Sequence, residues 1–110
     1  MCLPDVIKTM IITSGKHNDY YTEKPIMIIE ILSAATAKYD RSFKLYTYKQ
    51  ITSLVEYVMI EQHKHLVEVY RRVNGVWGYV AYGLDDDVHF GSIDLTFSVK
   101  DIYECVEIRD

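Results

Sequence analysis

The chain has 110 residues, a net charge of −4 and an apolar content of 49%, which predicts one globular domain with a single core. The negative balance argues against a passive nucleic-acid binder, which usually carries a basic surface, but not against an enzyme whose acidic side chains hold a metal. The chain has no apolar run of about 20 residues, no signal-peptide pattern and no disulfide signal from its two cysteines, so we expect a cytoplasmic protein without a membrane partner.

The first predicted strand covers residues 6–12 and directly follows Pro4 and Asp5. A polar, turn-rich segment then leads to a second strand over residues 24–33, which is rich in β-branched residues and apolar on both faces, as in a central strand. Glu30 interrupts this apolar run. Because burying an unpaired carboxylate costs several kcal/mol, Glu30 must be neutral, paired with a cation, or placed at the mouth of the strand to hold a metal.

The sequence then predicts a helix over residues 41–50, with Asp40 as its N-cap. Lys44 and Tyr48 are four residues apart and therefore share one face of this helix. A strand over residues 55–60 follows. A strand, a helix and a strand within about 35 residues form a right-handed crossover, which makes the two strands parallel.

The remaining chain alternates short strands and turns. Asn74-Gly75 is a strong hairpin signal between two further strands, and Ser98 is placed to cap a last helical turn. These elements predict an α/β fold: a mixed β-sheet with one main crossover helix and a C-terminal antiparallel meander. The meander strands are expected at residues 66–72, 76–82, 88–90 and 93–97, and the last turn at residues 99–104.

Three chemically active residues fall on neighbouring elements of this fold: Asp5, Glu30 and Lys44. Two carboxylates and a lysine can bind Mg²⁺, activate a water and stabilise charge on a phosphodiester, with the Ile31 carbonyl as a further hard ligand. In the structural alternative, Asp5 only ends a strand, and Glu30 and Lys44 form a buried ion pair. Spacing alone favours this alternative, because structural pairs are common.

A series of short motifs along nearly the whole chain adds a resemblance. These motifs are Pro4-Asp5, Ile28 to Ser33, Asp40-Arg41, Lys44, Tyr48, Glu56 to Val58, Val67 to Tyr70 and the Asn74-Gly75 hairpin. In this order they resemble the Uma-two family, restriction-endonuclease-like proteins of the PD-(D/E)xK nuclease superfamily. The superfamily usually has a lysine where this chain has Leu32, but in the Uma-two family the following helix supplies it, and Lys44 matches.

The resemblance implies a restriction-endonuclease-like domain over residues 1–110 that hydrolyses DNA. It also implies Asp5, Glu30 and Lys44 as the catalytic set and Mg²⁺ or Mn²⁺ as the cofactor. Members of the family carry a helix and strands before the Pro-Asp motif, and we expect this chain to lack them. The alternative function is a catalytically silent module that forms a homodimer or binds a partner through an uncovered strand edge.

Overall fold

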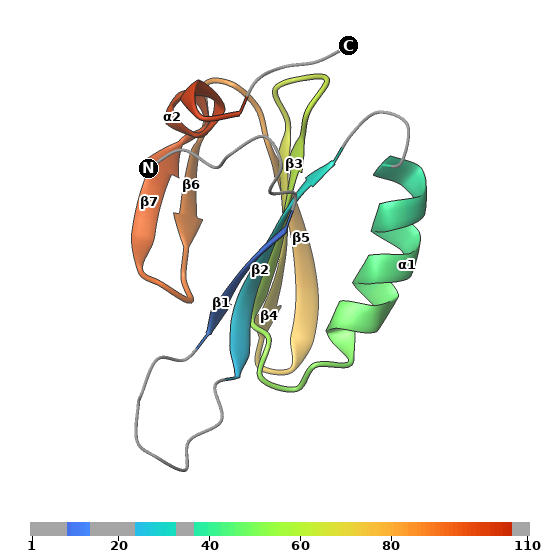
Figure 1. Ribbon diagram of the computed structural model, residues 1–110. Coiled ribbons are helices and arrows are strands. Elements are labelled where there is room, and N and C mark those ends of the chain that lie inside the picture. Colours follow the sequence, from blue (N-terminus) through green and yellow to red (C-terminus); the bar gives the residue numbers. More distant parts are fainter. Residues whose placement is uncertain (1–8, 14–23, 33–36, 107–110) are drawn as a thin grey trace.

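The computed structural model describes residues 9–13, 24–32 and 37–106. It forms a five-stranded mixed sheet with a helix on one face and a two-stranded hairpin with a short helix on the other (Figure 1). The elements are β1 (Thr9–Thr13), β2 (Pro25–Leu32), α1 (Ala37–Lys49), β3 (Glu56–Glu61), β4 (Val67–Val73), β5 (Val76–Tyr82), β6 (Asp87–Phe90), β7 (Leu95–Ser98) and α2 (Val99–Glu104).

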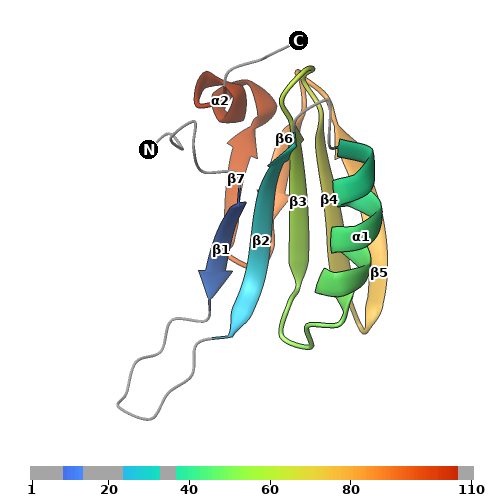
Figure 2. The same ribbon diagram turned by 45° about the vertical axis from the view of Figure 1, so that its right-hand side comes forward.

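The order of strands in the main sheet is β1-β2-β3-β4-β5 (Figure 2). β2 and β3 are parallel and are joined through α1, while the other neighbours are antiparallel. The predicted crossover and mixed sheet are therefore confirmed. β6 and β7 pair with each other in a separate two-stranded sheet, so the C-terminal part of the meander leaves the main sheet instead of extending it.

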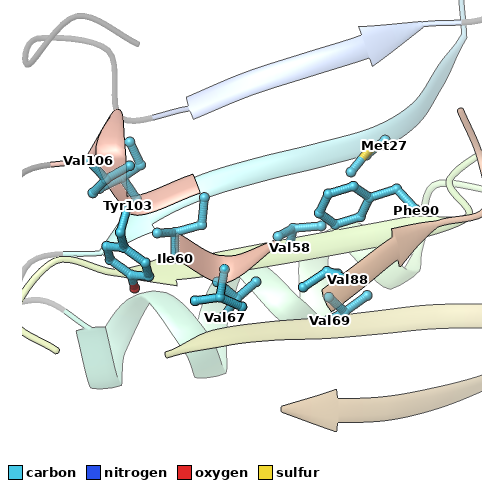
Figure 3. Packing of buried hydrophobic residues seen from close by; sticks show 11 residues of the cluster. Met27, Val58, Ile60, Val67, Val69, Val88, Phe90, Tyr103 and Val106 are labelled. Carbon is cyan, nitrogen blue, oxygen red and sulfur yellow. The ribbon is translucent and has the colours of Figure 1, made fainter. Parts of the chain in front are cut away.

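Alternation along the central strands divides the core into two layers, because successive strand residues point to opposite faces. Met27 and Ile31 of β2 contribute to the layer under β6, β7 and α2, whereas Ile28 and Leu32 contribute to the layer under α1. The first layer, seen in Figure 3, contains Met27, Ile31, Val58, Ile60, Val67, Val69, Val88, Phe90, Val99, Tyr103 and Val106. The second contains Ile28, Leu32, Leu54, Tyr57 and Met59.

The predicted turns are confirmed where the structure describes them. Asn74 and Gly75 have φ values of 52° and 78°, as a two-residue type I′ hairpin requires. Ser98 caps α2 and accepts a hydrogen bond from the Asp101 backbone N–H at 3.0 Å. Among the described residues, no helix is long and apolar enough to cross a membrane.

Two expectations were wrong. α1 begins at Ala37 rather than Arg41, so Asp40 lies inside the helix and is not its N-cap; the helix extends through Ala37 and Lys38, both favourable helix formers. Cys105 is disulfide-bonded in the structure, although the cysteine spacing gave no such signal; its partner lies outside the described residues.

Candidate active site

The site centres on Glu30, whose side chain projects from β2 on the α1 side of the sheet. Its neighbours on that face, Ile28 and Leu32, belong to the buried layer under α1, and Glu30 itself is only 1% exposed. The central position of β2 therefore removes this carboxylate from water, and the protein must supply its partners.

Three side chains supply those partners. Thr9 Oγ1 donates to Glu30 Oε2 at 2.8 Å, and Tyr48 Oη donates to Oε1 at 2.7 Å. Lys44 Nζ lies 3.2 Å from Oε2. The buried carboxylate thus receives one opposite charge and two hydroxyl hydrogen bonds, which offsets much of its desolvation cost.

Local geometry explains why these donors meet at one carboxylate. Lys44 and Tyr48 are one turn apart on α1, so both reach down to the sheet from the same helix face. Thr9 is the antiparallel Cα partner of Glu30 across β1 and β2, and such partners project to the same side. The Tyr48 ring packs edge-on against Tyr57 of β3, with ring centroids 5.0 Å apart, which helps to hold its hydroxyl in place.

Glu30 retains capacity for a further ligand. An ionised carboxylate offers about four acceptor positions, and the three contacts from Thr9, Lys44 and Tyr48 occupy three of them. The Lys44 side chain is 32% exposed, so the ion pair borders on solvent. Solvent therefore reaches the lysine end of this pair, while the carboxylate end is buried.

Glu56 provides a contrast on the opposite face of the sheet. It is fully buried and accepts from Arg71 Nε at 2.7 Å, from the backbone N–H groups of Gly91 and Ser92 at 3.2 and 2.8 Å, and from the Ser92 hydroxyl. Burial alone would raise the pKa of Glu56, but the hydrogen bonds from Ser92 and Arg71 outweigh it and lower the pKa below its usual 4.5. All of its acceptor positions are used, so Glu56 joins the β6–β7 connection to the sheet and is not a site candidate.

The structure brings together two of the predicted site residues, Glu30 and Lys44. Asp5 lies outside the described residues. Ile26 and Leu32 accept hydrogen bonds through their carbonyls from the β3 side, at 2.9 Å each. Because backbone direction alternates along a strand, the Ile31 carbonyl faces the β1 side.

In the parts of the chain that the structure describes, no group of three or more His, Cys, Asp or Glu side chains could hold a metal ion. The two turn histidines have separate surroundings: His63 Nδ1 lies 3.2 Å from Glu61 Oε2, and the His65 ring packs against Tyr103. The carboxylate of Glu30 and the carbonyl of Ile31 are among the oxygen donors of the described part of this site, beside the hydroxyls of Thr9 and Tyr48.

Sequence reasoning placed Tyr48 on the Lys44 face but did not predict its contact with Glu30, and it missed Thr9. The i, i+4 spacing of Lys44 and Tyr48 could have predicted the first contact. The second depends on the register of β1 against β2, which the polar loop between them does not reveal.

The mixed sheet with its crossover helix is compatible with a restriction-endonuclease-like fold, and a comparison with known proteins points to the same family. The family model described as "Putative restriction endonuclease", Uma-two, matches residues 4–98. The chain belongs to the Uma-two family. The matched range includes positions 5, 30 and 44.

A relative was also found among curated proteins. The uncharacterized protein slr1290 of Synechocystis sp. (strain ATCC 27184 / PCC 6803 / Kazusa) is 30% identical over 101 residues, which cover 91% of this chain and 53% of that protein. The chain therefore spans about half the length of this relative. Membership of the Uma-two family supports a nuclease-like function.

Proposed function

We propose that this Uma-two protein is a metal-dependent endonuclease that hydrolyses DNA phosphodiester bonds. The observation that carries the proposal is the contact between the buried carboxylate of Glu30 and the partly exposed ammonium of Lys44, 3.2 Å apart. A carboxylate with one acceptor position left, next to a lysine that borders on solvent, suits phosphodiester hydrolysis better than a saturated ion pair does.

The donors fit a hard divalent cation such as Mg²⁺ or Mn²⁺, because such ions prefer carboxylate and carbonyl oxygens. We assign Glu30, the Ile31 carbonyl and Asp5 as its ligands. When bound, the cation lowers the pKa of a water and offsets negative charge on the phosphate.

The other residues of the cluster have distinct roles in this proposal. Lys44 orients the attacking water or stabilises the charge that develops on the phosphate. Tyr48 and Thr9 hold the Glu30 carboxylate in one orientation, each through a hydroxyl hydrogen bond. They are positioning residues, because they act through Glu30.

A plasmid-cleavage assay with Mg²⁺ or Mn²⁺ tests the proposal. Glu30→Gln and Lys44→Met should each lower the cleavage rate by about 100-fold or more, the usual effect of losing one group that stabilises developing charge. Lys49→Met is the matched control: this lysine lies on the same helix but stands over the Tyr70 ring instead of Glu30, so its removal should leave cleavage unchanged. Equal cleavage by all four proteins would point to a contaminating nuclease and contradict the assignment.

A second candidate function is a catalytically silent module that persists for its interactions. It is favoured by one observation: Lys44 already neutralises Glu30, and the described part of the site contains no second carboxylate in a metal-binding group. Calorimetric titration with Mg²⁺ separates the two candidates. Heat of binding that disappears in Glu30→Gln supports the nuclease, whereas no binding to the wild-type protein supports the silent module.

A further inference from the structure

The outer edge of β5 is the least protected part of the main sheet. In the order of described strands, β5 is the last, and no strand pairs with its far side (Figure 2). Val76, Tyr79 and Val80 are 69%, 50% and 44% exposed. The seven residues of β5, VWGYVAY, include no charge and no proline. Natural edge strands are normally protected by one of these devices or by a bulge.

The opposite edge of the sheet shows such protection. The register of β1 against β2 shifts between Ile12 and Thr13. A strand with an irregular register is a poor template for another strand. The two edges of the same sheet therefore differ, and β5 is the one suited to pairing.

The direction of the β5 backbone follows from its neighbours. The Arg72 N–H donates to the Val55 carbonyl at 2.8 Å, so this residue of β4 faces β3. The alternate β4 residues face β5, and their partners there include Gly78 and Val80. The backbone groups of Trp77, Tyr79 and Ala81 therefore face outward, in the direction where a further strand would lie.

We propose that a second copy of this chain pairs with β5, antiparallel and with the two-fold axis at Tyr79. Tyr79 is the middle residue of β5, so this register uses the whole strand, and it brings together the outward-facing backbone groups of both copies. A two-fold through Gly78 would use less of the strand, because it would set Ala81 and Tyr82 opposite the Asn74-Gly75 turn of the partner and Trp77 opposite Tyr79. Axes at Trp77 or Ala81 would run the strand into a turn.

Side-chain size also fits this register. In an antiparallel pair centred on Tyr79, Trp77 lies opposite Ala81 of the partner strand, and Val80 lies opposite Gly78. In these two pairings a large side chain faces a small one, which allows close approach, while Tyr79 faces Tyr79 of the partner strand and Val76 faces Tyr82. Because β5 carries no charge, no pair of like charges is brought face to face, although the whole chain has a net charge of −4. This self-complementarity favours a second copy over an unrelated strand.

The test is sedimentation equilibrium of the full chain, without metal or DNA, so that its outcome is independent of the proposed nuclease activity. The wild-type protein should sediment with twice the mass of one chain and dissociate on dilution. Tyr79→Lys and Tyr79→Glu should each be monomeric, because a residue on the axis faces its own copy and places like charges opposite each other. An equimolar mixture of the two variants should restore the dimer.

Controls keep the result specific to this edge. Tyr46→Lys alters an exposed residue of α1, 70% accessible, and should leave the dimer intact. Circular dichroism should show that both Tyr79 variants are folded. Val80→Lys places a charge at a second position of β5 and should also weaken the dimer. A wild-type monomer at 100 µM or so, a dimer that survives both Tyr79 charges, or a mixture that stays monomeric would each overturn the proposed pairing.

Discussion

Glu30 and Glu56 are both buried on central strands, yet their surroundings differ at the level of single atoms. Glu30 has two hydroxyl donors and a lysine that is partly in water. Glu56 has an arginine, two backbone N–H groups and a serine hydroxyl. Among contacts with described residues, the first arrangement leaves one acceptor position of the carboxylate unused and the second leaves none, so of these two residues Glu30 is the candidate for chemistry.

Removing the charge of Glu56 should destabilise the fold. Glu56→Gln should lower the free energy of unfolding by about 2–3 kcal/mol, since hydrogen bonds to a buried charged group are lost and Arg71 loses its counter-ion. Urea unfolding at neutral pH measures this loss. Asp94→Asn, at an exposed acid 3.6 Å from His89, is the control and should change stability by less than about 0.5 kcal/mol.

The same residue predicts an acid dependence. Its pKa is lower in the folded state than the ordinary 4.5, so its contribution to stability is complete above pH 4.5 and is lost as the pH falls through the folded value. The wild-type protein should therefore lose stability below about pH 4.5, and Glu56→Gln should lose less over that range. An identical acid dependence in both proteins would contradict the role assigned to this carboxylate.

At the scale of elements, α2 secures the turn between β3 and β4. The Tyr103 hydroxyl lies 2.6 Å from the Glu61 carbonyl and 2.9 Å from the carbonyls of Lys64 and Leu66, and it accepts from the Leu66 N–H at 3.1 Å. One side chain of a six-residue helix thus contacts both ends of a turn about 40 residues earlier in the chain. Helix α2 therefore holds its place through this hydroxyl as well as through apolar packing.

Tyr103→Phe should cost about 1–3 kcal/mol, because the carbonyls of Glu61, Lys64 and Leu66 lose the hydroxyl that lies within hydrogen-bond distance of them. Burial raises the pKa of Tyr103 to about 12. The Tyr103 hydroxyl ionises at a lower pH in the unfolded chain than in the folded one. Its stabilising effect should therefore be complete below pH 10 and be lost as the pH rises toward 12. Thermal unfolding from pH 8 to 11 measures both effects, and Tyr46→Phe, at an exposed position, should show neither.

For the whole molecule, the two layers of core place the candidate site and the C-terminal hairpin on opposite faces of the sheet (Figure 1). The cluster around Glu30 depends on β1, β2 and α1, which come together only in the folded chain. A metal bound there would therefore bind the folded state and not the unfolded one. Such a ligand stabilises a protein by about 2.7 kcal/mol at 100 times its Kd.

Mg²⁺ should accordingly raise the melting temperature by several degrees, since about 1 kcal/mol corresponds to roughly 4–8 °C in a domain of this size. The measurement is scanning calorimetry with and without about 10 mM MgCl₂, with NaCl added so that both samples have the same ionic strength. Glu30→Gln should abolish the rise while Lys49→Met retains it. A rise that persists in Glu30→Gln would place the cation elsewhere on the protein.

The sequence by itself determined much of this protein, because several of its signals are local. Runs of β-branched and apolar residues between turn signals identified the strands, and the strand–helix–strand order made β2 and β3 parallel. Asn74-Gly75 specified the hairpin, and the four-residue spacing of Lys44 and Tyr48 placed them on one face. Each of these depends on neighbours within a few residues, where backbone geometry limits the choices. The fold class followed from them, and the Glu30–Lys44 ion pair was one of the two alternatives that the sequence left open.

Other features were decided only by the tertiary structure. Thr9 reaches Glu30 across 21 residues of sequence, and Ser92 reaches Glu56 across 36. β6 and β7 likewise leave the main sheet because they cover the apolar face of that sheet that lies opposite α1. Such contacts form because burial brings distant segments together, and no local pattern specifies which buried carboxylate will be saturated and which will keep an acceptor position.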